Sequence, residues 1–351
     1  MIVRVFRLAF PVAIVTVASF ASLSVSPARA ADAELNVYNW SEYIAKTTIP
    51  DFQKQTGVHV RYDVYDVYDS DDTLQSKLLA GSSGYDIVVP TSNYMARQIQ
   101  AGVYQKLDKT KLPNLANLDP ALMKKIAESD PGNQYGAPLD SWALVFDPAN
   151  VSKLKSCGVS FLDAPDDVFA AALQYLGKDP NSKNPADYHT AFDMLKKVRP
   201  YITQFNSSGY NNDLANNDVC VVLGWSGDVS VARREAAAAK RGYEIRYANP
   251  KEGGILWFDV MAIPKDAPHP EAALQWINYI QDPKVNADIT NEIYYPSANK
   301  AAHQYVTPAV AHDPNVYLTA DVLDRMTLSK PRSADIARLE NCLWQQLKTG
   351  N

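Results

Sequence analysis

The chain has 351 residues, of which 46% are hydrophobic and 21% charged, a length and composition typical of two ordinary globular domains. Its 34 basic and 39 acidic residues give a net charge of −5. This acidic balance argues against nucleic acid as a partner and favours a cationic ligand.

Residues 1–30 have the pattern of a secretory signal peptide. Arg4 and Arg7 make the start positively charged, residues 8–25 are apolar, and Ala28-Arg29-Ala30 is a small-x-small cleavage site. A membrane anchor is the alternative, but a proline and several hydroxyl residues weaken the apolar run, and the cleavage site follows it directly. We therefore expect export to the bacterial periplasm, removal of residues 1–30 and no membrane insertion of the mature chain.

Strand and helix patterns alternate along the first third of the chain. The expected strands are 35–40, 58–64 and 85–90, and the expected helices are 44–56, 73–80 and 94–101. Gly57 and Gly81 follow the first two helices, and glycine readily adopts the left-handed conformation that ends a helix. This alternation predicts a layered α/β lobe.

The rest of the chain continues the alternation. Residues 220–224 are an apolar run that we expect to be a buried strand, and a helix is expected over 229–240. Further strands are expected at 243–247 and 253–264, and further helices at 163–176, 188–198, 270–280, 284–292, 320–326 and 334–347. The whole mature chain therefore fits an α/β fold class.

An aromatic side chain lies near a carboxylate at the end of three predicted strands. The clusters are Trp40 with Glu42 and Tyr43, Trp225 with Asp228, and Trp257 with Asp259. Ligands of open α/β sheets bind beyond the carboxyl ends of the strands. A flexible polyamine needs flat apolar walls for its methylenes, and carboxylates and ring faces for its ammonium ends. Each cluster offers both; the alternative is that Asp228 only caps the following helix and Trp225 is a core aromatic.

Motifs for catalysis or metal binding are not found in the sequence. The five histidines lack the spacing of a zinc site, and the G-x-S-x-G, Walker A and G-x-G-x-x-G motifs are absent. Asp166 and Asp167 are paired carboxylates of the kind that some hydrolases use, but acids at a helix start explain them without catalysis. We expect no enzyme activity, no catalytic residues, no metal and no cofactor.

The chain has three cysteines, Cys157, Cys220 and Cys342. In an oxidising compartment two of them can form a disulfide, and the spacing alone does not choose which. Cys157 and Cys220 both lie in the middle of the chain, where a bridge inside one lobe fits. Cys342 lies on a C-terminal helix pattern and is expected to be a buried thiol.

Several segments of the chain match a known family, among them Val37-Tyr-Asn-Trp-Ser-Glu-Tyr43 and Gly224-Trp-Ser-Gly-Asp228. The others are 84–90, 154–165, 175–181, 212–216, 258–260 and 298–300. Through these segments the chain resembles the periplasmic polyamine-binding proteins of bacterial ABC importers, most closely the putrescine-binding type. The resemblance covers nearly all of the mature chain.

The resemblance implies a two-lobed periplasmic-binding-protein fold, type II-like, in which each lobe is a mixed sheet flanked by helices. Lobe 1 would comprise 31–136 and about 248–285, and lobe 2 would comprise 137–247 and about 286–351. The protein would be a monomer that captures a polyamine in the cleft between the lobes and delivers it to an inner-membrane ABC permease. Putrescine is the expected ligand, with spermidine and cadaverine as alternatives.

The resemblance also implies the residues of the ligand site. They are Trp40, Ser41, Glu42, Tyr43, Thr91, Asp167, Trp225, Asp228, Trp257, Asp259 and Tyr295. Asp228 and Asp259 would hold the two ammonium groups, and Trp225 and Trp257 would flank the methylenes. The disulfide of the family falls on Cys157 and Cys220.

One segment of the family is missing from this chain. After the equivalent of Gly136, family members have a stretch that crosses between the lobes and supplies a central strand, whereas here Gly136 is followed directly by Ala137. Two alternatives to the transport function stay open. One is a polyamine sensor that docks on a membrane signalling protein, and the other is a binding-impaired copy that results from the missing segment.

Overall fold

The structure is a computed structural model of the chain and describes residues 33–41, 43–64, 71–142, 154, 156–250 and 252–350. Residues Ala33–Asn351 form one compact unit. The predicted signal peptide, residues 1–30, lies outside the described residues and stays a prediction.

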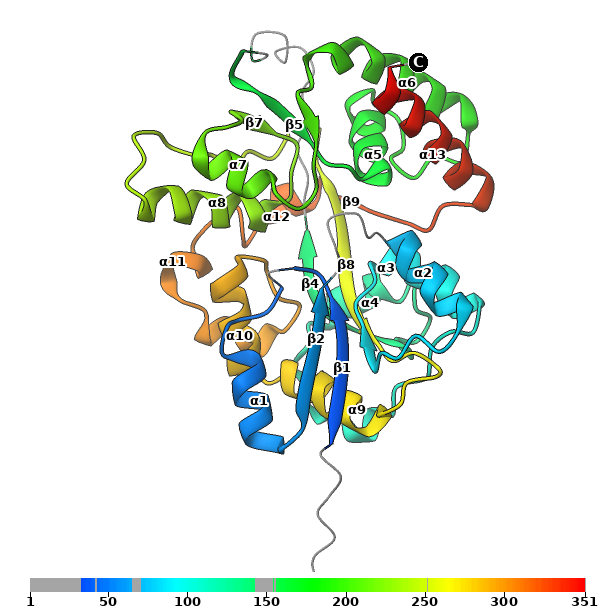
Figure 1. Ribbon diagram of the computed structural model, residues 1–351, viewed down its shortest axis with the longest axis vertical. Coiled ribbons are helices and arrows are strands. Elements are labelled where there is room, and N and C mark those ends of the chain that lie inside the picture. Colours follow the sequence, from blue (N-terminus) through cyan, green and yellow to red (C-terminus); the bar gives the residue numbers. More distant parts are fainter. Residues whose placement is uncertain are drawn as a thin grey trace, which may run out of the picture. The chain divides into compact units, whose positions relative to one another are not determined.

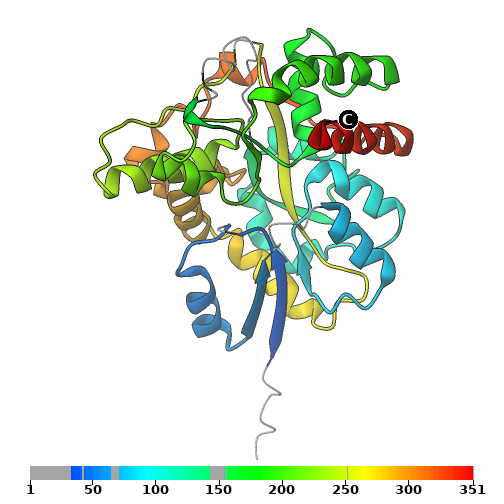
Figure 2. The ribbon, with the colours of Figure 1, turned by 45° about the horizontal axis from the view of Figure 1, so that its top comes forward.

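The larger sheet has six strands, in the order β2-β1-β3-β8-β4 with β9 beside β8. Its strands are β1 (Glu34–Asn39), β2 (His59–Val64), β3 (Ile87–Val88), β4 (Gly136–Trp142), β8 (Ile255–Ala262) and β9 (Thr327–Leu328). β1 is parallel to β2 and β3, whereas β8 is antiparallel to β3 and β4, so the sheet is mixed. Figures 1 and 2 show β8 as the long yellow strand that extends from this sheet toward the second one.

The second sheet has three parallel strands, in the order β6-β5-β7. They are β5 (Val159–Phe161), β6 (Gln204–Phe205) and β7 (Val221–Val222). A disulfide joins Cys157 to Cys220, whose Cα atoms lie 5.5 Å apart, and it ties the start of β5 to the start of β7. This confirms the pairing that the family resemblance implied.

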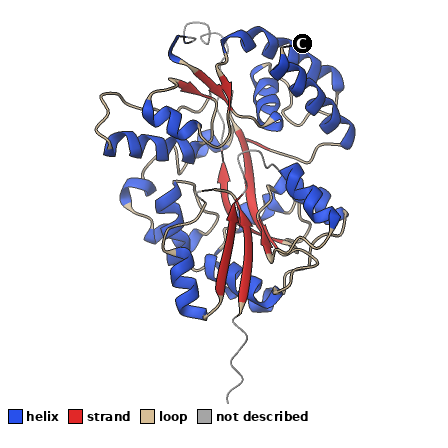
Figure 3. Cartoon of the chain, viewed as in Figure 1, coloured by secondary structure: helices blue, strands red, loops and turns tan. Residues whose placement is uncertain are grey.

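Helices flank the strands on both sides (Figure 3). The α-helices are α1 (Thr48–Thr56), α2 (Asp71–Ala80), α3 (Ser92–Gln100), α4 (Pro120–Ile126), α5 (Pro165–Tyr175), α6 (Pro185–Val198), α7 (Tyr210–Asn216), α8 (Ser226–Ala238), α9 (Pro270–Ile280), α10 (Pro283–Ile293), α11 (Pro308–Ala311), α12 (Ala320–Leu323) and α13 (Ala334–Thr349). Short 3-10 helices are η1 (Lys109–Lys111), η2 (Pro113–Asn117), η4 (Arg199–Tyr201) and η5 (Lys300–Tyr305). Proline opens α4, α5, α6, α9, α10 and α11, because its fixed φ suits a first helical turn and the N–H that it lacks has no intrahelical partner there.

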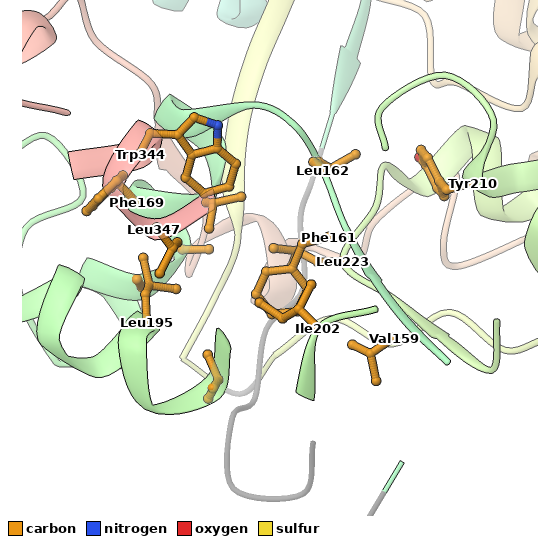
Figure 4. Close-up of a cluster of buried hydrophobic side chains, with 14 of the residues drawn as sticks. Val159, Phe161, Leu162, Phe169, Leu195, Ile202, Tyr210, Leu223, Trp344 and Leu347 are labelled. Atoms are coloured by element: carbon orange, nitrogen blue, oxygen red, sulfur yellow. The ribbon is translucent and has the colours of Figure 1, made fainter. Parts of the chain in front are cut away.

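Each sheet has its own hydrophobic core. Around the three-stranded sheet, the small-sheet core includes Phe161, Phe169, Leu195, Leu223 and Trp344 (Figure 4). Around the six-stranded sheet, the large-sheet core includes Val37, Phe52, Ile87, Trp276 and Tyr295. Trp225 is partly buried and packs against both cores. A further cluster, with Tyr38 and Phe258, also packs on the six-stranded sheet. Separate cores around the two sheets are the arrangement that a two-lobed α/β fold requires.

The lobe boundaries predicted from the sequence, near residues 136, 247 and 285, stay a prediction. Ile289 and Ile293 of α10 pack in the large-sheet core, although the prediction placed 286–351 in the second lobe. Trp344 and Leu347 of α13 pack in the small-sheet core. The C-terminal part of the chain therefore contributes to both cores.

The strand β4 was not predicted from the sequence. It runs antiparallel to β8, with Gly136 opposite Ala262 at one end and Trp142 opposite Trp257 at the other. The residues that directly follow Gly136 therefore supply a strand beside β8, at the point where the family resemblance implies that a segment is missing. β8 therefore has β4 as an antiparallel neighbour on this side, even though the segment is missing.

The start and the edge of β4 are fixed by side chains. Buried Asp130 accepts hydrogen bonds from the N–H groups of residues 134–136, at 3.0, 2.8 and 2.9 Å. β4 is the last strand in the sheet order, and its register shifts between Pro138 and Asp140. Gln281 Nε2 donates to the carbonyl oxygen of Pro138 at 2.7 Å. The row of backbone groups along this edge strand, which could otherwise pair with another strand, is therefore interrupted at Pro138.

Several sequence-based predictions of local structure are wrong. The buried strand expected at 220–224 is the two-residue β7, which is only half-buried. Residues 243–247 form no strand: Tyr243, Ile245 and Tyr247 pack against the small-sheet core, so their alternation reflects side-chain packing on an irregular backbone. Cys342 is an exposed free thiol instead of a buried one. The buried positions of α13 are Ile336, Glu340, Leu343, Trp344 and Leu347, and Cys342 lies outside this stripe of the helix.

Candidate ligand-binding site

The N-terminus of α8 carries one end of the candidate site. β7 ends at Val222, and α8 begins at Ser226 with Trp225 as its N-cap. Asp228 therefore lies inside the first turn of the helix, where the helix dipole favours a negative charge. The alternative interpretation of Asp228 as the N-cap is wrong, because Trp225 has that position.

Two tyrosine hydroxyls hold the carboxylate of Asp228. Tyr210 Oη donates to Oδ2 at 2.8 Å, and Tyr295 Oη donates to Oδ1. Each hydroxyl also accepts a backbone N–H, Tyr210 from Trp225 at 2.8 Å and Tyr295 from Asp228 at 2.9 Å. Burial raises the pKa of both phenols well above the usual value, and the negative charge of Asp228 raises it further. Both phenols therefore stay protonated and act as donors.

Two glycines make room for these tyrosines. A Cβ atom at Gly224 would lie 2.5 Å from Cε2 of Tyr210, and one at Gly227 would lie 2.1 Å from Cζ of Tyr295. Non-bonded carbon atoms pack at about 3.5–4.0 Å, so only glycine fits at either position. Because Tyr210 belongs to the small-sheet core and Tyr295 to the large-sheet core, Asp228 lies where the two cores meet.

Asp259 on β8 is a second carboxylate held by a tyrosine, and it is almost completely buried. Tyr43 Oη donates to its Oδ2 at 2.6 Å. Thr91 forms an isolated antiparallel bridge with Asp259. Asp71 fixes Thr91 by accepting from its hydroxyl at 2.8 Å and from its N–H at 3.2 Å.

Aromatic rings connect the two carboxylates. The ring centroids of Tyr43 and Tyr295 lie 6.1 Å apart, and their hydroxyls donate to Asp259 and Asp228 respectively. Trp257 is buried in the large-sheet core with both tyrosines, and Trp40 and Trp225 pack against the same core. Flat apolar surfaces beside two anions favour a ligand that is both cationic and partly apolar.

Asp167 in the first turn of α5 adds a third carboxylate. Trp225 Nε1 donates to its Oδ2 at 3.3 Å. Burial raises the pKa of Asp167 well above its usual range, and the charge of the neighbouring Asp166 raises it further, while Arg332 and Trp225 lower it in part. Trp225 thus connects Asp167 to the helix start that carries Asp228.

The raised pKa of Asp167 makes the stability of the ligand-free protein depend on pH. A carboxyl whose pKa is higher in the folded than in the unfolded state stabilises the fold fully below its unfolded pKa, and this contribution is lost as the pH rises through the folded pKa. We expect the melting temperature of the wild type to fall over that interval relative to that of Asp167→Asn. Thermal unfolding of both proteins from about pH 4 to about pH 9 measures the difference, and parallel profiles would contradict the expectation.

A cavity lies beside Asp166 and not among the residues predicted for the site. It is lined by Asn93, Tyr94, Arg97, Asp166, Arg332, Ala337, Glu340 and Asn341. Arg332 is paired with Glu340 at 2.8 Å and donates to the backbone oxygen of Asp166 at 2.7 Å. We place the candidate site at Asp228 and Asp259, because the rings and carboxylates that suit a cation are gathered there.

The contacts link most of the predicted site residues into one group. Those joined by hydrogen bonds, a backbone bridge or ring contacts are Tyr43, Thr91, Asp167, Trp225, Asp228, Asp259 and Tyr295. Trp40 and Trp257 pack with this group. Ser41 is exposed, with no described contact to the group, and Glu42 lies outside the described residues.

Sequence reasoning missed Tyr210 and Asp71, which hold Asp228 and Thr91 in place. Gly224 was the available signal for Tyr210, since a glycine before a functional residue often marks the close approach of another group. It does not reveal which of the 20 tyrosines approaches. No local pattern pointed to Asp71.

The chain matches the family described as bacterial extracellular solute-binding protein over residues 47–318. It belongs to this family. Its members bind solutes, which confirms the expectation that the protein is not an enzyme. Within the described residues, none of the helices has the length and apolar character needed to span a bilayer.

Similar proteins agree with this membership along nearly the whole chain. The putrescine-binding periplasmic protein PotF of Escherichia coli is 45% identical, with 94% of this chain and 95% of that protein covered. The putrescine-binding periplasmic protein SpuD of Pseudomonas aeruginosa is 44% identical, with 92% and 94% covered. A spermidine/putrescine-binding periplasmic protein of Escherichia coli is 33% identical, with 94% and 96% covered.

Solved structures share the fold. One from Listeria monocytogenes has a TM-score of 0.81 and 25% identity, and covers 91% of this chain and 99% of its own. The Tp0655 lipoprotein of Treponema pallidum has a TM-score of 0.75 and 26% identity, with 90% and 99% covered. These likenesses confirm the expected two-lobed fold. Neither the sensor nor the binding-impaired alternative receives support from them.

Proposed function

We propose that the protein captures a polyamine in the periplasm, with putrescine as the leading ligand, and delivers it to the permease of an ABC importer. The observation that carries the proposal is the pair Asp228 and Asp259, each held by a tyrosine hydroxyl and connected through the rings of Tyr43 and Tyr295. Relatives named as putrescine-binding, at 45% and 44% identity, support the same ligand class. Spermidine and cadaverine are the alternative ligands.

A diamine matches this arrangement chemically. Each ammonium group has three donors and no acceptor, so it is best satisfied by a carboxylate, and such charge-assisted hydrogen bonds are about twice as strong as neutral ones. Asp228 and Asp259 would each take one ammonium, while Trp225 and Trp257 would flank the methylenes and attract the charges through their ring faces. An anionic solute would leave these carboxylates without a cation, which is costly in a buried site.

Ligand binding would also hold the two cores together. Asp228 lies on α8, whose Val229 and Ala232 pack in the small-sheet core. Asp259 lies on β8 of the six-stranded sheet. A diamine that engages both carboxylates therefore binds best when the two cores are brought together, and it stabilises that arrangement by its differential affinity.

Isothermal titration calorimetry with putrescine, cadaverine and spermidine tests the proposal. Butane-1,4-diol is the matched control ligand, because it has the length of putrescine without the charges, and we expect no heat from it. Thermal unfolding provides a second readout, since a ligand at 100 times its Kd stabilises the folded state by about 2.7 kcal/mol. No heat and no thermal shift with any of the three amines would overturn the proposal.

The remaining expectations from the sequence belong to the same proposal. The mature protein would be a periplasmic monomer that starts after Ala30 and does not bind nucleic acid. The acidic net charge of −5 supports the absence of nucleic-acid binding. N-terminal sequencing of the protein recovered from the periplasm checks the cleavage site.

A further inference from the structure

Tyr210 lies at the centre of the contacts that fix the α8 end of the site. It is the first residue of α7, is 1% exposed and packs in the small-sheet core (Figure 4). Its hydroxyl donates to Asp228 Oδ2 and accepts from the N–H of Trp225, both at 2.8 Å. Its ring meets the indole of Trp225 edge-on, with the centroids 6.2 Å apart. One buried side chain therefore contacts both the carboxylate and the indole of this end.

We propose that Tyr210 is a positioning residue that fixes one end of the ligand site and thereby selects the length of the diamine. The inference rests on the proposed function. An aspartate side chain can change rotamer and move its carboxylate, but a donor held on a buried ring and by a backbone N–H restricts that movement. At the other end, Tyr43 holds Asp259 on β8 in the same way. With both carboxylates fixed, the ligand has to match the span between them.

Tyr210 and Tyr295 have different roles in this arrangement. They hold opposite oxygens of Asp228 but belong to different cores. Tyr210 shares the small-sheet core with Leu223 and Val229, on either side of Trp225, so it accompanies Asp228 when the cores move relative to each other. The contact of Tyr295 depends on the two cores being together. Tyr210 therefore orients the carboxylate before the ligand arrives.

Tyr210→Phe tests the inference, because it removes only the hydroxyl. Calorimetry with putrescine and with cadaverine, which is one methylene longer, measures both affinity and length selection. We expect the Kd for putrescine to rise about tenfold, the usual effect of losing a hydrogen bond to a charged group. We expect the ratio of the cadaverine Kd to the putrescine Kd to fall by about threefold or more, because a released carboxylate can follow a longer ligand.

Tyr188→Phe is the matched control. Tyr188 is completely buried in the same core, and its hydroxyl donates to the backbone oxygen of Ser182 at 3.2 Å and also bonds with Arg332. The variant therefore loses the hydrogen bonds of one buried tyrosine hydroxyl that contacts neither Asp228 nor Trp225. Its affinities and its Kd ratio should equal those of the wild type. Gly224→Ala is a second test variant, because it keeps the hydroxyl but displaces the Tyr210 ring, and it should reproduce the loss of length selection.

The possible results are distinguishable. Wild-type affinities in Tyr210→Phe would overturn the positioning role, and so would an equal loss for both diamines with an unchanged Kd ratio. Either result would leave the proposed function standing. No binding of any diamine by the wild type would overturn the proposed function and this inference with it.

Discussion

Asp228→Asn should raise the Kd for putrescine by about 30-fold or more, which corresponds to about 2 kcal/mol. The asparagine has the same shape and can still accept a hydrogen bond from Tyr210, but it carries no charge for the ammonium group. Its amide also places a donor where Tyr210 and Tyr295 already donate to both oxygens. Calorimetry on the purified variant measures the change.

Asp193→Asn is the control for this experiment. Asp193 pairs with Lys196 on α6, and its side chain is 67% exposed, so the variant removes one charge at a distance from the site. We expect wild-type affinity. If Asp228→Asn also remained within a few tenths of a kcal/mol of the wild type, Asp228 would be only an acid that complements the helix dipole.

Gly227→Ala should weaken putrescine binding by about 100-fold or more. The added Cβ would lie 2.1 Å from Cζ and 2.3 Å from Cε1 and Cε2 of Tyr295, so the ring has to leave its place. Tyr295 would then lose its hydrogen bonds with Asp228, and the contact between the cores that accompanies ligand binding would be disrupted. Calorimetry and thermal unfolding with and without putrescine measure the effect.

The same substitution is expected to change the stability of the ligand-free protein much less. Alanine is favoured over glycine by about 0.5–1 kcal/mol in a helix, and this gain offsets part of the cost of displacing Tyr295. Gly242→Ala is the control, because its Cβ would meet no atom within 4 Å. Equal putrescine affinity in both glycine variants would show that the close approach of Tyr295 is not required for binding.

The fold could be predicted where local pattern determines the backbone. The helix expected at 270–280 is α9 with the same bounds, because its apolar spacing and its initial proline are both local signals. β4 could not be predicted in this way. Its sequence contains Pro138 and no regular alternation, and its extended conformation depends on pairing with β8, far along the chain. Residues 243–247 show the opposite case. Apolar and charged side chains alternate there as they do in a strand, but the segment does not form one.

Only part of the candidate site could be predicted, because only some of its residues have a local signal in the sequence. Asp228 follows Trp225 shortly after the end of β7, and this pattern is visible in the sequence. Asp259 also follows an aromatic residue, but it lies inside β8 and not at the strand end that the sequence predicted. Tyr295 and Thr91 have no such local signal, and only the family resemblance indicated them. The hydroxyl of Tyr210 meets Asp228 through the packing of α7 on α8, and no sequence pattern encodes a contact of that kind.

The interruption of β4 at Pro138 has a consequence for how these molecules behave when crowded together. An edge strand with a continuous row of free N–H and C=O groups is a template on which another chain can add a strand. At Pro138 the backbone has no N–H, the carbonyl is already bonded to Gln281, and the register shift follows immediately. Pro138 and Gln281 are also buried, so the edge of the six-stranded sheet is covered at this point and offers no template there for self-association.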